Sequence, residues 1–202
     1  MADSRIGTEP IYTNSLGQPI YWIDGAPQGS RTENQTYLLV LHHTAGSDSR
    51  RWLAGDAPNT VSATYLVGAY ADTQYRPRIY KYMSERTKVP YTQGFGSIGG
   101  LRPAMNTHCI SIEVEGPGPI TEANPLGFSS DLLGTTATLA ASILADWHNT
   151  RGRSLLVVGH DHIDRYDRKG RHTDPHYDWT KMLQMIYSRL PALTGNVKGW
   201  GR

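Results

Sequence analysis

The sequence predicts an α/β domain with a mixed central β-sheet flanked by helices. Two continuous apolar runs, residues 37–43 and 154–159, have the length of strands and the composition of strands that are buried in a sheet. Between them, apolar residues recur at helical spacing from Asp131 until Gly152 ends the pattern, which predicts one long helix. Strands that alternate with helices in this way are typical of a sheet covered by helices.

Shorter patterns place the remaining elements. Residues 78–83 alternate and predict a strand, and one short strand is expected at residues 20–23. A short helix or turn should begin near residues 58–60, and apolar positions at helical spacing predict a final helix over residues 179–190. The expected order is strand, short helix, strands, long helix, strand and helix.

The segment at residues 109–115 alternates strictly and predicts a strand with two different faces. Ile110, Ile112 and Val114 should point one way and the polar residues of the segment the other. The single cysteine of the chain, Cys109, is expected to be a small core residue, and no intrachain disulfide can form. Glu113 has two interpretations: a solvent-exposed strand carboxylate, or a general base facing a polar cleft.

Length and composition predict one domain with additional segments. A chain of 202 residues, 38% of them hydrophobic and 19% charged, can bury a core of its own and has the composition of a soluble globular protein. Residues 37–191 are expected to form the main domain. Residues 1–36 should form an N-terminal arm that packs on it, and residues 192–202 a loose tail.

Charge and hydropathy exclude several kinds of partner. The net charge is +2, and no basic run is dense enough to follow a phosphate backbone, so nucleic acid is not expected as a partner. No apolar run approaches the about 20 residues of a membrane span, and the N-terminus leads into no apolar signal segment. We expect a monomer that is made in the cytoplasm without a signal peptide and does not insert into a membrane.

Two histidines stand at the ends of the two apolar runs. His42 lies near the end of the first, His160 follows the second, and Asp174 lies in a Thr-Asp-Pro sequence. Strand ends are where α/β sheets assemble sites, and two imidazoles with one carboxylate suit a hydrolytic Zn²⁺ that keeps its fourth position open. His43 is the alternative to His42, because neighbouring strand residues face opposite sides. The competing interpretation is that these are ordinary surface or core histidines.

The charged segment at residues 161–171 joins two of these candidate ligands. It is either a solvated loop or a source of cations near the metal, one of which could stabilise an oxyanion. The chain has no Gly-x-Ser-x-Gly elbow, and a carboxylate base beside a metal needs no serine or cysteine nucleophile. Glu113 is therefore the candidate base.

Taken together, these motifs resemble the zinc-dependent N-acetylmuramoyl-L-alanine amidases of the type 2 family, which share their fold with the peptidoglycan recognition proteins. The resemblance covers roughly residues 37–190. It is carried, in the family's order, by residues 41–45 (LHHTA), 61–66 (VSATYL), 106–113 (NTHCISIE) and 159–175. No single segment is decisive, but four in the correct order are specific.

The resemblance implies a zinc site and a reaction. His42, His160 and Asp174 match the family's zinc ligands, and Glu113 matches its acid/base glutamate. The implied reaction is hydrolysis of the amide between the lactyl group of N-acetylmuramic acid and L-alanine in peptidoglycan. Zinc would activate the water and polarise the carbonyl, and Glu113 would carry the proton to the leaving nitrogen.

The chain departs from the family at three places. His172 stands where the family commonly has a lysine that stabilises the tetrahedral intermediate, a role that Lys169 or Arg171 could also take. The loop between the second and third ligands is several residues longer than in compact members. Residues 62–65 (SATY) and 91–94 (YTQG) replace the family's Ser-Ala-His-Tyr and Trp-His-Ala-Gly, in regions where we expect substrate contacts.

A cell-wall substrate without a signal segment is typical of a phage or prophage endolysin, a bacteriolytic and antimicrobial enzyme. A cytoplasmic recycling enzyme or the catalytic part of a larger lysin would show the same features. A non-catalytic peptidoglycan-binding protein on the same fold is the main alternative, although such proteins typically lack a zinc ligand. Another zinc hydrolase, such as a stem-peptide peptidase, is disfavoured because there is no His-Glu-x-x-His helix.

Overall fold

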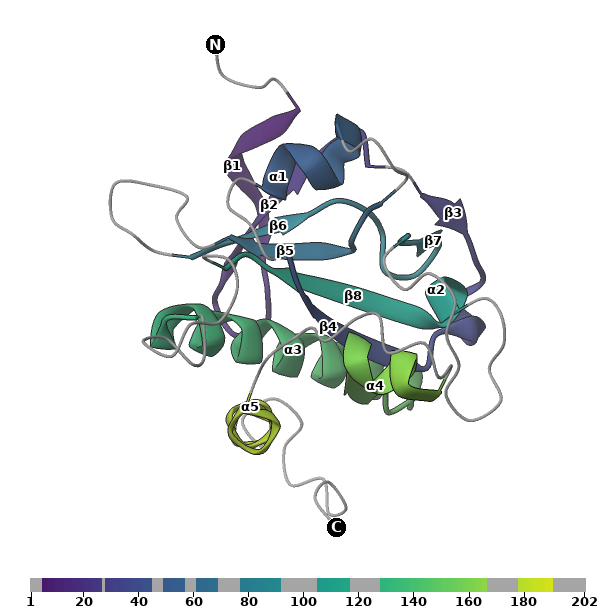
Figure 1. The fold of residues 1–202 in the computed structure, drawn as a ribbon, viewed down its shortest axis with the longest axis vertical. Coiled ribbons are helices and arrows are strands. Elements are labelled where there is room, and N and C mark those ends of the chain that lie inside the picture. Colours follow the sequence, from purple (N-terminus) through teal and green to yellow (C-terminus); the bar gives the residue numbers. More distant parts are fainter. Residues whose placement is uncertain are drawn as a thin grey trace.

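A seven-stranded mixed β-sheet forms the centre of the protein, and helices lie on both of its faces (Figure 1). The computed structural model describes residues 5–26, 28–44, 49–56, 61–68, 77–91, 105–116, 128–166 and 178–190. In spatial order the strands are β1 (Ile6–Thr13), β2 (Pro19–Ile23), β6 (Arg78–Lys81), β5 (Tyr65–Gly68), β8 (Cys109–Val114), β4 (Leu38–His43) and β9 (Leu156–Gly159). A separate pair joins β3 (Gly29–Ser30) to β7 (Lys88–Val89). The helical segments are η1 (Glu33–Gln35), α1 (Ser49–Arg51), η2 (Trp52–Asp56), α2 (Met105–His108), α3 (Ser130–Arg151), α4 (His160–Tyr166) and α5 (Trp179–Tyr187).

Four neighbouring strands, β5, β8, β4 and β9, run parallel to one another. The predicted strand at residues 37–43 is β4, which lies between β8 and β9 and is buried over its whole length. The predicted buried strand at residues 154–159 is β9, but Leu156 is exposed because β9 is the edge of the sheet. Parallel strands bring their carboxyl ends to one edge, where side chains from β8, β4 and β9 meet.

The two faces of the parallel strands pack into different clusters. Ile110, Ile112 and Val114 belong to the large core beneath α3. Cys109 points the other way and packs with residues of β4, β9 and α4. The strict alternation predicted for residues 109–115 is confirmed, as is the prediction that Cys109 is a core residue.

Helix α3 confirms the long predicted helix and has a cap at each end. Ser129 accepts a hydrogen bond from the Leu132 amide at the N-terminus, and Gly152 adopts the left-handed conformation that ends the helix, with φ of 61°. Trp147 of this helix is buried in the large hydrophobic core between α3 and the sheet. α5 begins at its Asp178 cap, packs against α3, and confirms the final predicted helix (Figure 1).

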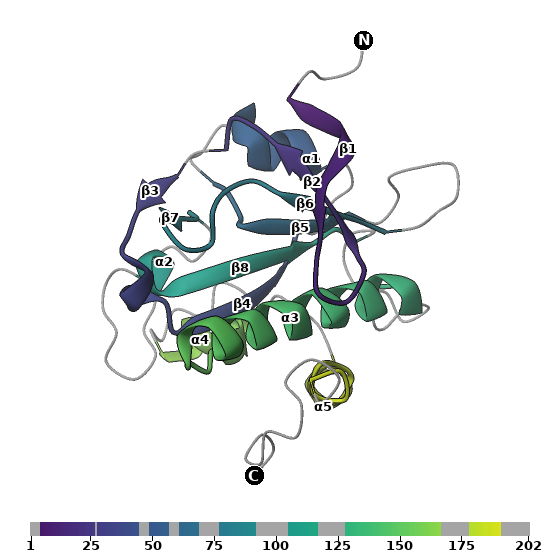
Figure 2. The ribbon, with the colours of Figure 1, turned by 180° about the vertical axis from the view of Figure 1, so that it is seen from behind.

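The N-terminal segment is part of the main sheet. β2 confirms the predicted strand at residues 20–23 and pairs in parallel with β6. β1 was not predicted, because it is an exposed edge strand with Pro10 inside it and register shifts on either side of that proline. Figure 2 shows the turn between β1 and β2 reaching down to α3, where Ser15 and Ser142 share a hydrogen bond of 2.8 Å.

Some predicted elements fall partly outside the described residues. The short helix or turn expected near residues 58–60 lies outside the described residues, and α1 and η2 come before it in the chain. The tail at residues 192–202 is also outside it. In the ranges that the structure describes, no helix combines the length and apolar character needed to cross a membrane.

Two glycine substitutions should change stability in opposite directions. At Gly25 the backbone has φ of 97°, and an added Cβ would lie 2.9 Å from the Ala54 carbonyl oxygen, so Gly25→Ala should lower the free energy of unfolding by about 1–3 kcal/mol. At Gly134, inside α3, an added Cβ meets nothing within 4 Å, so Gly134→Ala should raise it by about 0.5–1 kcal/mol. Urea unfolding followed by circular dichroism would measure both; equal effects would contradict the argument.

Candidate active site

Three polar side chains lie side by side at the carboxyl ends of β8, β4 and β9: Glu113 on β8, His42 on β4, and His160, the first residue after β9. His42 on β4 is directly opposite Glu113 on β8, and Leu41 is opposite Gly159, so His160 comes next to His42. Residues in one row of a parallel sheet point to the same face. The ring centroids of His42 and His160 are 4.6 Å apart, with the planes inclined at 56°. The structure therefore brings together two of the histidines that the sequence singled out.

Glu113 lies beside His42, on the side away from β9. Its Oε1 lies 3.8 Å from Nδ1 of His42, which is within ion-pair range but longer than a hydrogen bond. Glu113 is 6% exposed and His42 2% exposed, so the interpretation of Glu113 as a solvent-exposed strand carboxylate is wrong. A buried carboxylate beside two imidazoles is typical of a functional site.

His43 occupies the opposite face of β4. Its ring packs edge-on against Phe128 with centroids 4.8 Å apart. A Cβ added at Gly116 would lie 2.9 Å from His43 Nε2 and 2.7 Å from the Phe128 ring, so this contact is tightly packed. The structure thus places His42 beside His160, and His43 away from it.

The junction between β9 and α4 positions His160. The strand ends at Gly159 and the helix begins at His160, which is 5% exposed. The Gly159 amide donates a hydrogen bond of 3.0 Å to Nδ1 of His162, and the His162 ring lies 4.7 Å from the Trp179 ring of α5. His162 was predicted only as part of a charged segment; no sequence pattern identifies it as the residue that closes this junction.

Glu115 ties the segment after β4 to the neighbouring strand. It directly follows β8, is buried, and accepts a hydrogen bond of 2.5 Å from the Ser49 amide. Burial first, and then the charge of Glu115, raises the pKa of Tyr82 well above its ordinary value. The protonated Tyr82 hydroxyl donates to the Arg50 carbonyl at 3.2 Å. Sequence reasoning missed this support of the site.

Thr64 corrects one expectation about substrate contacts. It stands at the position where the family has histidine, but it is completely buried. Its amide donates to Ser111 Oγ at 3.0 Å, and the Ser111 amide donates to Thr64 Oγ1 at 3.2 Å. Thr64 therefore holds β8 at Ser111, two residues before Glu113, and its side chain is not exposed to a ligand.

The other predicted site residues lie outside the described part of the chain. These are the third proposed ligand, Asp174, and the three candidates for oxyanion stabilisation, His172, Lys169 and Arg171. Among the residues that the structure does describe, no group of three His, Cys, Asp or Glu side chains could hold a metal ion. His42 and His160 fit a shared metal ion, since both imidazoles are buried and their ring centroids are only 4.6 Å apart.

Several solved structures have the same fold. The hydrolase AmiA of Staphylococcus aureus is 16% identical, with a TM-score of 0.59 over 98% of this chain and all of that one (100%). The amidase AmiD of E. coli is 22% identical, with a TM-score of 0.57 over 91% of this chain and 66% of that one. AmpDh3 of Pseudomonas aeruginosa is 22% identical, with a TM-score of 0.56 over 75% of this chain and 60% of that one.

The chain spans less than two thirds of the length of AmpDh3 and AmiD. These likenesses confirm the predicted fold, a mixed sheet flanked by helices as in the type 2 amidases. A comparison with curated protein sequences gave no match. The family model for N-acetylmuramoyl-L-alanine amidase matches residues 32–177, well over half of the chain. This chain is therefore a member of the N-acetylmuramoyl-L-alanine amidase family.

Proposed function

We propose that this protein is a zinc-dependent amidase that separates the lactyl group of N-acetylmuramic acid from L-alanine in peptidoglycan. The observation that carries the proposal is the row of Glu113, His42 and His160 at the carboxyl edge of the sheet, in a chain of the amidase family. The AmpDh3 structure holds an anhydromuramic pentapeptide, and the AmiD structure holds anhydro-N-acetylmuramic acid with a stem peptide, which supports a muropeptide as the substrate class.

His42 and His160 would hold the zinc ion, and Asp174 is the proposed third ligand. Two neutral imidazoles and one carboxylate are a common ligand set of hydrolytic zinc. Zinc bound there would supply a Lewis acid for the amide carbonyl and would lower the pKa of water toward about 7.

Glu113 is the proposed acid and base. Its carboxylate takes the proton from the attacking water and returns it to the nitrogen of L-alanine as the amide bond breaks. The surrounding low dielectric strengthens its interaction with the reacting groups. His172 is proposed to stabilise the oxyanion, with Lys169 and Arg171 as the alternatives.

The setting of the enzyme is also part of the proposal. We propose that it acts as a bacteriolytic endolysin, which degrades the cell wall and stays in the host cytoplasm until its release. A protein that only binds peptidoglycan is the alternative. The presence of both histidines and of the buried Glu113 favours catalysis.

Zinc removal should abolish the release of stem peptides. We expect purified peptidoglycan treated with the zinc-loaded protein to yield peptides with a free N-terminal L-alanine, identified by mass spectrometry. A chelator should stop their release and added zinc should restore it. Intact peptidoglycan after treatment with zinc-loaded protein would favour the binding protein, and fragments with other termini would favour a peptidase.

A further inference from the structure

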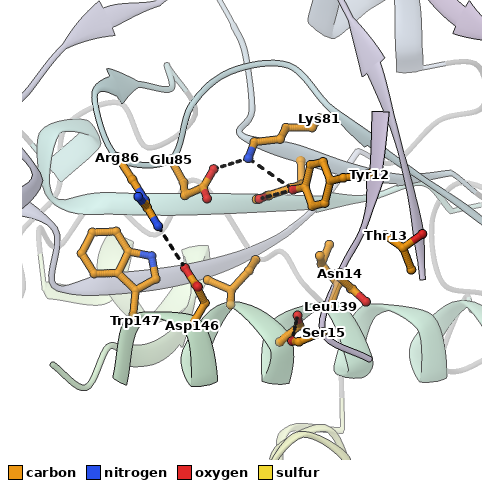
Figure 3. Close-up of a pocket in the computed structure, with 13 residues that line it drawn as sticks. Tyr12, Thr13, Asn14, Ser15, Lys81, Glu85, Arg86, Leu139, Asp146 and Trp147 are labelled. Atoms are coloured by element: carbon orange, nitrogen blue, oxygen red, sulfur yellow. Dashed lines mark hydrogen bonds and ion pairs between the residues drawn. The ribbon is translucent and has the colours of Figure 1, made fainter. Parts of the chain in front are cut away.

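A pocket lies on the other face of the sheet from the candidate active site. It has a volume of about 280 Å³ and is bounded by the end of β1 and its turn, the end of β6 with the following loop, and α3 (Figure 3). Tyr65 lines it, and Tyr65 is paired in register with Ile112, the residue before Glu113. Successive residues of a strand face opposite sides, so the pocket and Glu113 are on different faces.

The charged side chains of this pocket are already paired. Lys81 forms an ion pair with Glu85, and Arg86 lies 3.7 Å from Asp146 across the space between the loop and α3 (Figure 3). These two pairs balance, so the pocket offers no net charge to a ligand. A charged ligand would have to break one of the pairs.

Uncharged polar groups and aromatic rings complete the lining. Burial raises the pKa of Tyr65 well above its ordinary value, so its hydroxyl stays protonated, and it lies 3.5 Å from the hydroxyl of Tyr12. Lys81 Nζ is 5.3 Å from the centres of both tyrosine rings and donates to the Tyr12 hydroxyl at 3.3 Å. Tyr12 is 39% exposed and forms an aromatic wall. An apolar ligand would leave these polar groups without water.

From this lining and size we propose that the pocket binds one neutral pyranose ring. A sugar has hydroxyls that both donate and accept, and an apolar face that packs on an aromatic ring such as Tyr12. The volume is near the lower end for small-molecule sites and fits a ligand of one ring. That the ring is an N-acetylated amino sugar of the glycan strand rests on the proposed function; bound there, the strand would hold the enzyme on the wall while the other face acts on a stem peptide.

The test uses the full chain and the trimer of N-acetylglucosamine as the probe, titrated by ¹H–¹⁵N nuclear magnetic resonance. We expect saturable binding with Kd of the order of 1 mM, and shifts concentrated in β6, its following loop and α3. Glu113→Gln should bind the trimer equally well. No saturable binding at ten times that concentration would overturn the proposal.

Three variants locate the binding. Tyr12→Ala removes the aromatic wall and should weaken binding about three- to tenfold. Asp146→Trp, at a rim position where the aspartate is 45% exposed, should block the pocket and abolish binding. Tyr187→Ala is the matched control, since Tyr187 lies on α5, outside the pocket, and is 40% exposed. Unchanged binding in both pocket variants, or equal weakening in the control, would overturn the proposal.

The two proposals fail separately. A protein that binds the trimer through Tyr12 but releases no stem peptides would refute the amidase and leave the sugar pocket. An active amidase that does not bind the trimer would refute the pocket alone.

Discussion

Glu113→Gln should reduce the rate of amide hydrolysis by about 10²–10⁴-fold while the protein keeps its zinc. The amide side chain has nearly the same shape, but it cannot take a proton from water at neutral pH or give it to the leaving nitrogen. Glu113 lies 3.8 Å from Nδ1 of His42, close enough to serve the reacting groups. The loss should appear in kcat, with little change in KM. The assay would use a soluble muropeptide and would measure the free amino group of L-alanine that hydrolysis exposes.

Glu115→Gln is the matched control for this experiment. Glu115 is two residues further along the chain, directly after β8, and it is buried to the same extent as Glu113, 6% exposed in both cases. Its role is to accept a hydrogen bond from the Ser49 amide, which the glutamine carbonyl oxygen can also do. This variant should keep most of the activity. Full activity in Glu113→Gln would exclude Glu113 as the base, and equal losses in both variants would point to a general effect of charge.

The sequence was sufficient for those parts of the fold that depend on local patterns. The apolar run at β4, the alternation of β8 and the capped helix α3 all follow from periodicity and end residues. β1 could not be predicted, because an exposed edge strand with a proline has no alternating pattern. Its place depends on pairing with β2 and on contacts of the turn with α3, which lie far away in the sequence.

The candidate site, like the fold, could be predicted only in part from the sequence. The sequence could identify a histidine pair at residues 42–43, but the choice between them depends on which face α3 covers, and only the structure shows that. The row of Glu113 beside His42 depends on the register of β4 and β8, two strands about 70 residues apart in the chain. The motif placed residues 62–65 in a region of expected substrate contacts, but the burial of Thr64 and its bonds to Ser111 show a structural role.

His42→Ala and His160→Ala should each remove the metal and the activity together. Each substitution deletes one of two adjacent imidazoles, and two remaining ligands are too few for a hydrolytic zinc site. We expect zinc content, measured by plasma mass spectrometry, to fall from about one ion per chain to well below one. Amide hydrolysis should fall by at least about 10³-fold, since the Lewis acid is lost with the metal.

His43→Ala separates loss of metal from loss of packing. His43 is the neighbouring residue on β4, but its ring packs on Phe128 on the other face. This variant should lose about 1–3 kcal/mol of stability through the vacated contact and should still bind zinc. His42→Ala and His43→Ala each remove an imidazole from the same end of β4. The two variants therefore differ in which face of the sheet loses its imidazole. Zinc loss in His43→Ala with retention in His42→Ala would exchange the two roles and refute the assignment of the site to the face that carries Glu113.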